Sequence, residues 1–116
     1  MFTIGQILRL KPDTFEEYKR RHDELWPEMI EVMNSFQINM AIYLYGELLF
    51  LFATAPDEKS WRALENHSIT PRWDEYMSDV LERIEGDSYY VDVPCVFAFG
   101  EFALGASPKK KKSKAK

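Results

Sequence analysis

A stripe of apolar side chains at helical spacing occupies residues 13–36 and constrains the fold more than any other feature of this sequence. The stripe brings large side chains onto one helix face, namely Phe15, Tyr18, Leu25, Trp26, Met29, Met33 and Phe36. The opposite face is densely charged, so the segment predicts an amphipathic helix that packs against another layer. Pro27 lacks a backbone donor, and it must either kink this helix or begin a second one.

His22 lies inside that stripe, one helical turn from Tyr18 and one turn from Trp26. A histidine in this position is either a core residue with satisfied ring nitrogens or a working proton carrier. The second interpretation is chemically open because an unperturbed imidazole titrates near neutral pH.

The rest of the chain changes between strand-like and helix-like patterns, in the order strand, long helix, strand, strand, helices, strand. We expect strands at residues 2–10, 38–45, 48–55 and 91–102. We expect further helices at residues 57–66 and from Thr70 to Gly86. This order predicts an α+β fold of the ferredoxin-like βαββαβ type, an antiparallel sheet with helices on one face.

The segment 48–55, LLFLFATA, is apolar on both faces, as expected of an inner strand that is covered on both sides. Helices in so short a chain can cover only one of these sides. The other side should meet a second copy of the protein, which predicts a homodimer of the dimeric α+β barrel type.

Length and charge exclude several classes of partner. We expect one domain over residues 1–105, followed by a disordered lysine-rich tail over residues 106–116. Removing the six lysines of the last eight residues from the formal net charge of −4 leaves −10 on the rest, which disfavours nucleic acid. No apolar run is long enough to cross a membrane, and a single cysteine, Cys95, fits a reducing compartment. We therefore expect a cytoplasmic protein.

The groove between the first helix and the sheet should contain His22, with Tyr18 beside it and the helix of Trp73 closing it. An imidazole, phenol groups and an indole suit a neutral, polyhydroxylated ligand such as a monosaccharide. For Trp73, core packing and substrate contact fit the pattern equally well. The sequence shows no metal-ligand spacing and no glycine-rich phosphate loop, so we expect no metal and no cofactor.

The second strand adds either phenols or thioether and aliphatic groups to this groove. Tyr43 and Tyr45 lie on one of its faces, and Met40 and Ile42 lie on the other. Because both faces of the sheet are apolar, alternation does not decide which one meets the helices.

Four segments of the sequence carry a family resemblance: KPDTFEEYKRRHDELWPEM at 11–29, AIYL at 41–44, LLF at 48–50 and RWDEYMSDV at 72–80. Over nearly all of residues 2–99 the chain resembles the L-rhamnose mutarotase family. The resemblance implies a small, cytosolic, cofactor-free dimer that interconverts the α and β anomers of a deoxyhexose pyranose. At matching positions it implies a proton-donating role for His22 and substrate contact by Tyr18 and Trp73.

Two positions depart from that family pattern. Met40 stands where the family has a tyrosine, and Asp74 stands where it has a second tryptophan. Neither change touches His22, so the reaction type is better supported than the sugar, and L-fucose is an alternative to L-rhamnose. Asp74 is either a substrate contact or a charge in the first turn of its helix, stabilised by the helix dipole.

Opening a hemiacetal ring needs a proton at the ring oxygen and the removal of one from the anomeric hydroxyl. We predict that His22 is the general acid at the ring oxygen, and that Tyr18 holds the sugar and can relay the second proton. Two other functions fit the same patterns: a cofactor-independent monooxygenase of the dimeric α+β barrel type, and a non-catalytic sugar-binding domain.

Overall fold

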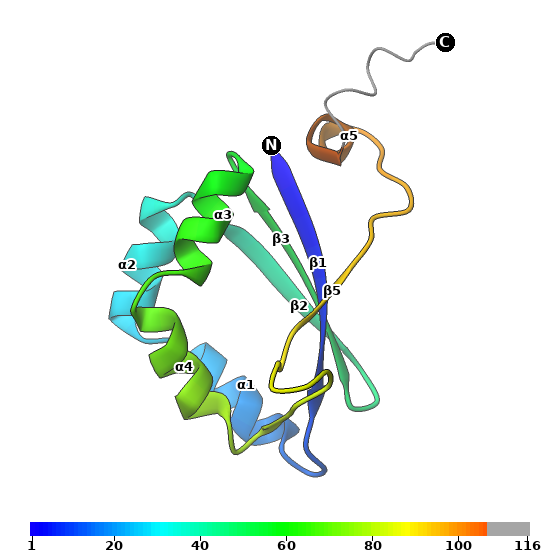
Figure 1. Cartoon of the computed structure of the whole chain (residues 1–116). Helices are drawn as coiled ribbons and strands as arrows, with labels where there is room; N and C mark the ends of the chain where they lie inside the picture. Colours follow the sequence, from blue (N-terminus) through cyan, green and yellow to red (C-terminus); the bar gives the residue numbers. More distant parts are fainter. Residues whose placement is uncertain (107–116) are drawn as a thin grey trace.

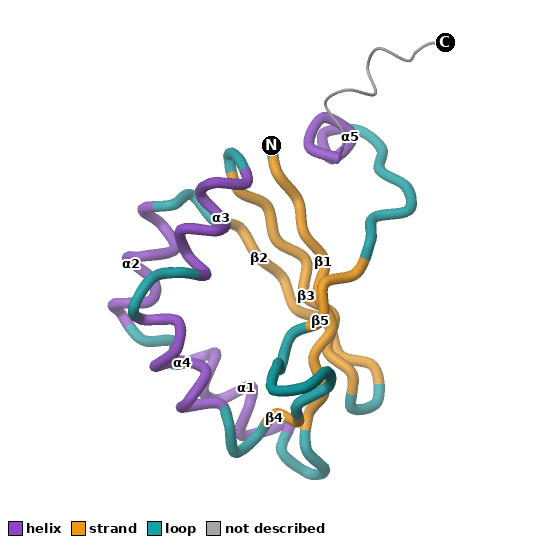
Figure 2. The backbone as a smooth tube through the Cα atoms, in the orientation of Figure 1, coloured by secondary structure: helices purple, strands orange, loops and turns teal. Residues whose placement is uncertain are grey.

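The computed structural model describes residues 1–106, which form an antiparallel sheet with helices packed on one of its faces (Figures 1 and 2). The elements are β1 (Phe2–Leu10), α1 (Phe15–Asp23), α2 (Pro27–Ser35), β2 (Asn39–Tyr45), β3 (Leu48–Ala55), α3 (Glu58–Glu65), α4 (Ile69–Met77), β4 (Leu81–Glu82), β5 (Val91–Val93) and α5 (Glu101–Ala106). Helices α1 to α4 all lie on the same side of the sheet (Figure 1). The predicted α+β architecture is confirmed.

Strand β1 is the centre of the sheet. It pairs along nearly its whole length with β3, from Phe2 opposite Ala55 to Arg9 opposite Leu48, and β3 in turn pairs with β2. On its other edge β1 pairs with β5 at residues 5–7 and with β4 at residues 9–10. Gly46 closes the β2–β3 hairpin with a φ of 62°, a left-handed conformation that favours glycine.

The helical stripe of residues 13–36 is divided between two helices. Helix α1 ends at Asp23, Trp26 has an extended backbone, and Pro27 occupies the first turn of α2. The missing N–H of Pro27 is one that a helix start leaves unpaired in any case, so the proline begins the second helix without losing a hydrogen bond. The second of the two predicted outcomes is therefore the observed one.

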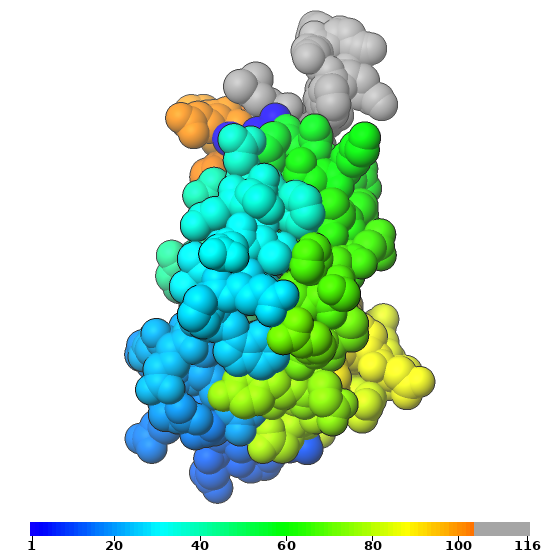
Figure 3. All heavy atoms as spheres, turned by 90° about the vertical axis from the view of Figure 1, so that its left-hand side faces the viewer, coloured from blue at the N-terminus to red at the C-terminus, as the bar shows by residue number. Residues whose placement is uncertain are grey.

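The core lies between the helices and one face of the sheet. The buried positions of β1 alternate through Gln6, Leu8 and Leu10, and β3 buries Leu49 and Leu51 on the same face. The side chains of α1 and α2 meet those of α3 and α4 over this face (Figure 3).

On the second strand, Met40 and Ile42 face the helices, whereas Tyr43 and Tyr45 point the other way. The two tyrosines are 68% and 78% exposed. The sequence left open which face of this strand meets the helices. In the structure it is the face of Met40 and Ile42, and the two tyrosines lie outside the groove.

Helix α4 is shorter than predicted. It runs from Ile69 to Met77, whereas the sequence pattern suggested a helix from Thr70 to Gly86. After Met77 the chain turns, the N–H of Val80 bonds the carbonyl of Met77, and Leu81 pairs with Leu10 in the sheet. Val80 and Leu81 are buried and apolar, and their positions in the sequence continue the helical spacing of α4. In the structure, however, they pack into the core from a turn and from a strand.

The last strand is also shorter than predicted. Strand β5 ends at Val93, next to Pro94, which cannot donate a hydrogen bond to a neighbouring strand. The predicted strand residues Phe97 and Phe99 are each 79% exposed and belong to no strand. Phe102, at the start of α5, packs edge-on against Phe52 with ring centroids 5.2 Å apart.

Three further expectations concern the lysine-rich tail, membrane-spanning helices and metal sites. The lysine-rich stretch of the predicted tail, Lys109 to Lys116, lies outside the described residues. Within residues 1–106 no helix is long and apolar enough to cross a membrane. The same part of the chain contains no cluster of three or more His, Cys, Asp or Glu side chains arranged to hold a metal ion.

Candidate active site

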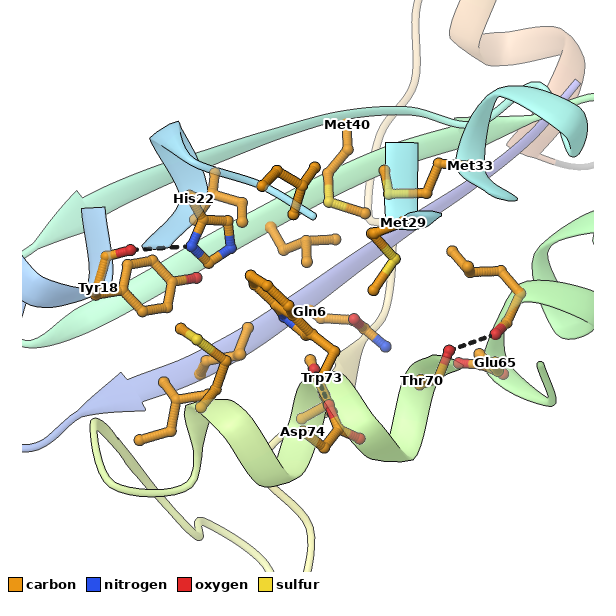
Figure 4. Close-up of a pocket in the computed structure, with 18 of the residues that line it drawn as sticks. Gln6, Tyr18, His22, Met29, Met33, Met40, Glu65, Thr70, Trp73 and Asp74 are labelled. Atoms are coloured by element: carbon orange, nitrogen blue, oxygen red, sulfur yellow. Dashed lines mark hydrogen bonds between the residues drawn. The ribbon is translucent and has the colours of Figure 1, made fainter. Parts of the chain in front are cut away.

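A cavity of about 290 Å³ lies between the sheet and helices α1 to α4 (Figure 4). Most of its wall is apolar, and its polar side chains come from elements far apart in the sequence. Tyr18 and His22 come from α1, Trp73 and Asp74 from α4, and Gln6 from β1. Glu65 on α3, Thr70 on α4 and Tyr90 before β5 also line the cavity. The structure therefore brings all four predicted site residues, His22, Tyr18, Trp73 and Asp74, to one cavity.

The His22 ring is oriented by a hydrogen bond within its own helix. Its Nδ1 lies 3.1 Å from the carbonyl oxygen of Tyr18, one turn earlier. A carbonyl can only accept, so Nδ1 carries the hydrogen of the neutral ring and Nε2 keeps its lone pair. Nε2 is on the side of the ring away from this bond, toward the cavity (Figure 4). Burial lowers the pKa of His22 below its ordinary value of 6.5 and favours the neutral form.

Aromatic rings hold His22 from two sides. The Tyr18 ring lies 4.3 Å away between centroids, and Trp73 meets the imidazole edge-on at 5.3 Å. Trp73 in turn packs against Trp26 and Tyr76, with centroids 5.1 Å and 5.6 Å apart. This cluster fixes the imidazole against α4, and its members Tyr18, His22 and Trp73 line the cavity.

Tyr18 is buried, with 6% of its surface exposed, and burial raises the pKa of its phenol well above the ordinary value. The hydroxyl therefore stays protonated and can donate a hydrogen bond. Among the described residues it has no hydrogen-bond partner. A buried hydroxyl without a protein partner is costly, so this group is available to a ligand.

Asp74 lies in the middle of α4, not in its first turn, so the helix-dipole interpretation is wrong. Its Oδ1 accepts a hydrogen bond of 2.6 Å from the hydroxyl of Tyr90. Burial raises the pKa of Asp74, and the bond from Tyr90 opposes that shift. Asp74 is half-buried and lines both the cavity and a more open hollow next to Tyr90, so a substrate contact by its carboxylate stays a prediction.

Sequence reasoning missed Gln6 as a cavity residue. Its Nε2 donates to Asp92 Oδ1 at 2.8 Å, and its side chain is buried in the cavity wall. The available signal was a single polar residue on the apolar face of the first strand. Three methionines complete the opposite wall, Met29 and Met33 from α2 and Met40 from β2.

Arg21 joins the two helices that supply the site. Its guanidinium donates to Glu17 on α1 at 2.6 Å, to the carbonyl of Tyr76 at 2.6 Å, and to Asp79 at 2.8 Å and 3.2 Å. It also lies over the Tyr76 ring, 4.6 Å from its centroid. These contacts hold α1, with His22, in a fixed position against the C-terminal end of α4, with Trp73.

The fold and the cavity together define a class: a small α+β protein of the ferredoxin-like type whose enclosed site offers a neutral imidazole, a phenol and an indole. Such a site can bind a small neutral molecule and move a proton on it.

Comparison with known proteins identifies the family. The family model described as L-rhamnose mutarotase matches residues 3–99. A curated L-rhamnose mutarotase from Escherichia coli is 41% identical over 78 residues, which cover 65% of this chain and 75% of that protein. One from Shigella flexneri is 38% identical over the same length and coverage.

The crystal structure of an L-rhamnose mutarotase from Formosa agariphila shares the fold, with a TM-score of 0.69 and 23% identity. The match covers 86% of this chain and 98% of that one. The chain belongs to the L-rhamnose mutarotase family, a family of isomerases. The resemblance seen in the sequence is confirmed, and the monooxygenase alternative has no support.

Proposed function

We propose that this protein is a mutarotase that interconverts the α and β anomers of a 6-deoxyhexose pyranose such as L-rhamnose by acid–base ring opening. The single observation that carries the proposal is a neutral imidazole, fixed by its Nδ1 and lying against an otherwise mostly apolar cavity of about 290 Å³. A pyranose has few atoms, and the cavity is near the lower end of the volumes that small ligands occupy.

In the proposed reaction His22 moves one proton between two oxygens of the sugar. Neutral Nε2 accepts the proton of the anomeric hydroxyl while the C1–O5 bond breaks, which gives an aldehyde at C1 and an imidazolium. The same nitrogen then donates that proton to O5, to which the bond electrons have gone. Because both oxygens are bonded to C1, one nitrogen can reach each in turn. Rotation about C1–C2 and the reverse steps close the ring as the other anomer.

This sequence of steps keeps the predicted role of His22 as the acid at the ring oxygen and adds a preceding basic step. The lowered pKa of His22 supports that order, because the resting ring is neutral at neutral pH. Tyr18 contributes a protonated hydroxyl that can donate to a sugar oxygen, and Trp73 offers an indole for the C–H face of the ring.

The methionine wall supports a 6-deoxy sugar. Met29, Met33 and Met40 line the cavity together with Ile42, and none of these side chains donates a hydrogen bond. A methyl group at C6 gains from such surroundings, whereas a C6 hydroxyl there loses its hydrogen bonds to water.

We further propose that the protein acts as a homodimer in the cytoplasm. Tyr43, Tyr45, Phe50 and Phe52 are exposed on the sheet face away from α1 to α4, which is a large apolar surface for a monomer to leave in water. Among the described residues, Phe102 of α5 contacts this face at Phe52. The free thiol of Cys95 suits a reducing compartment.

The proposed activity is tested by exchange NMR between the anomer signals of L-rhamnose and L-fucose, with the spontaneous rate subtracted. His22→Gln should lower the enzymatic rate roughly 100-fold or more, because it removes the proton carrier. His67→Gln is the matched control, since His67 does not line the cavity. Equal rates in the two variants would remove His22 from the mechanism. Sugar binding by the wild type without faster exchange would instead identify a non-catalytic sugar-binding domain.

A further inference from the structure

Two polar side chains of the cavity are held by neighbouring residues of one segment. Gln6 on β1 donates its Nε2 to Asp92 on β5, and Asp74 on α4 accepts from Tyr90, just before β5. Each of these side chains ends in a planar group with two polar atoms. Residues 90–92 form a hydrogen bond with one of the two atoms in each case. The other atom of each, Gln6 Oε1 and Asp74 Oδ2, has no hydrogen-bond partner among residues 1–106.

These unpaired atoms indicate a ligand with hydroxyl groups. Gln6 is only 5% exposed, so its free amide oxygen is not satisfied by bulk water. Gln6 Oε1 and Asp74 Oδ2 are both acceptors, and an ionised carboxylate accepts only. Gln6 on the sheet and Asp74 on α4 both lie beside residues 90–92, so their free acceptors suit two hydroxyl donors of a neutral molecule, and the negative charge of Asp74 disfavours an anion.

The positions of these side chains relative to His22 indicate which hydroxyls they meet. Figure 4 shows His22 and Tyr18 at one end of the site, with Gln6 and Asp74 beyond Trp73. In the proposed reaction His22 must contact O1 and O5. In a pyranose, C4 lies across the ring from C1 and C3 lies across it from O5. A sugar held at its anomeric end by His22 therefore presents its C3 and C4 hydroxyls to the far wall.

We propose that Gln6 and Asp74 form a pair of acceptors that binds the C3 and C4 hydroxyls of the sugar, so that configuration at C4 decides which 6-deoxyhexose this protein turns over. Tyr90 and Asp92 are positioning residues that hold the two acceptors. The inference rests on the proposed mutarotase activity and adds to it the part of the sugar that is recognised.

The test compares sugars that differ at one carbon. 6-Deoxy-L-talose differs from L-rhamnose only at C4, and 6-deoxy-L-glucose differs from it only at C2. Exchange NMR gives kcat/KM for each, and we expect the two C4 epimers to differ about tenfold or more in the wild type, the effect of misplacing a bound hydroxyl. Asp74→Asn turns the free acceptor into a donor while keeping an oxygen for Tyr90, and Gln6→Met removes both polar atoms at similar size. Each should bring the C4 ratio toward one and leave the C2 ratio unchanged.

Glu75→Gln is the matched control, because it changes an exposed carboxylate next to Asp74 that does not line the cavity. Tyr90→Phe should shift the C4 ratio in the same direction as Asp74→Asn but less, since the carboxylate remains and only its support is lost. Thermal unfolding shows whether Gln6→Met folds, and Asp74→Asn carries the test if it does not.

The outcomes separate this inference from the activity itself. If the wild type exchanges these sugars and His22→Gln abolishes exchange, an unchanged C4 ratio in Asp74→Asn overturns the acceptor pair and leaves the mutarotase proposal intact. A change of the C2 ratio instead overturns the assignment of the pair to C3 and C4. If the wild type accelerates none of the sugars, both proposals fail.

Discussion

At the scale of single residues, the site depends on which nitrogen of His22 carries the hydrogen. The Tyr18 carbonyl fixes it on Nδ1 and leaves a basic Nε2 for the cavity. Burial lowers the pKa of His22, while its hydrogen bond to Tyr18 and the nearby carboxylate of Asp23 oppose the shift. The cavity also holds the carboxylates of Asp74 on α4 and Glu65 on α3 and the phenol of Tyr90 before β5.

This arrangement predicts how activity depends on pH. The neutral ring is the active form, so kcat/KM should be constant at neutral pH and fall only as pH drops through a pKa below 6.5. The free energy of unfolding should change in the same direction. Because the folded state lowers the pKa, the contribution of His22 to stability is complete above 6.5 and is lost as pH falls toward the folded-state value.

Exchange rates measured over a pH series on the wild type and on His67→Gln give this profile. The chain has two histidines, so in His67→Gln the only remaining one is His22. A rate that rises as pH falls below 6.5 would contradict the basic first step and show that protonated His22 starts the reaction.

Single residues of the site differ in how far they could be predicted. His22, Tyr18 and Trp73 could be, because helical spacing places them on apolar faces that must meet the sheet. Gln6 stood out as a polar residue on an apolar strand face, but its hydrogen-bond partner could not be predicted, since Asp92 lies 86 positions away. The partner of Asp74 was hidden for a similar reason, because Tyr90 reaches it from a segment without helical or strand periodicity.

At the scale of elements, the fold was predictable wherever one period held throughout a segment. Strands β1 and β3 were predicted to the residue because their alternation or flanking turns set both ends. The end of α4 was not, since Val80 and Leu81 continue its helical spacing while they pack from a turn and a strand. Local pattern cannot distinguish these cases, because tertiary contacts decide where a helix stops.

The alignment of α1 with α4 gives a prediction at this scale. Arg21→Gln should lower the free energy of unfolding by about 1–3 kcal/mol, because it leaves the Tyr76 carbonyl without its donor and breaks the bonds to Asp79 and Glu17. It should also lower kcat, because His22 and Trp73 then lose their fixed relative position.

Urea unfolding and exchange NMR measure the two effects of Arg21→Gln. Arg20→Gln is the matched control on the same helix, since the ion pairs of Arg20 go to Glu17 and Glu24 on its own helix, at the surface, where solvent screens them. Equal stability of the two variants would show that the bonds from Arg21 to the end of α4 do not hold the helices together.

At the scale of the whole molecule, helices α1 to α4 cover one face of the sheet, and the other face is largely exposed apart from the contact of α5 at Phe52. Phe50 lies near the middle of the exposed face, directly opposite Tyr43 on β2 and Ile7 on β1. Face-to-face packing of two such sheets would bury these side chains and leave the helices of both subunits outside, with a sugar cavity in each subunit. Stable dimers bury on the order of 1,200 Å² or more in total, which a sheet of this length can supply.

Phe50→Glu therefore provides the last prediction. A charge at the centre of an apolar interface cannot be paired by the same substitution on a symmetric partner, so the variant should be a monomer by light scattering where the wild type is a dimer. The monomer should stay folded by circular dichroism, because Phe50 is exposed and lies outside the core between sheet and helices. Ile30→Glu is the matched control, an exposed apolar residue on α2, on the helix side, and it should leave the dimer intact. A wild-type monomer, or a dimer that survives Phe50→Glu but dissociates with Ile30→Glu, would contradict association through the sheet.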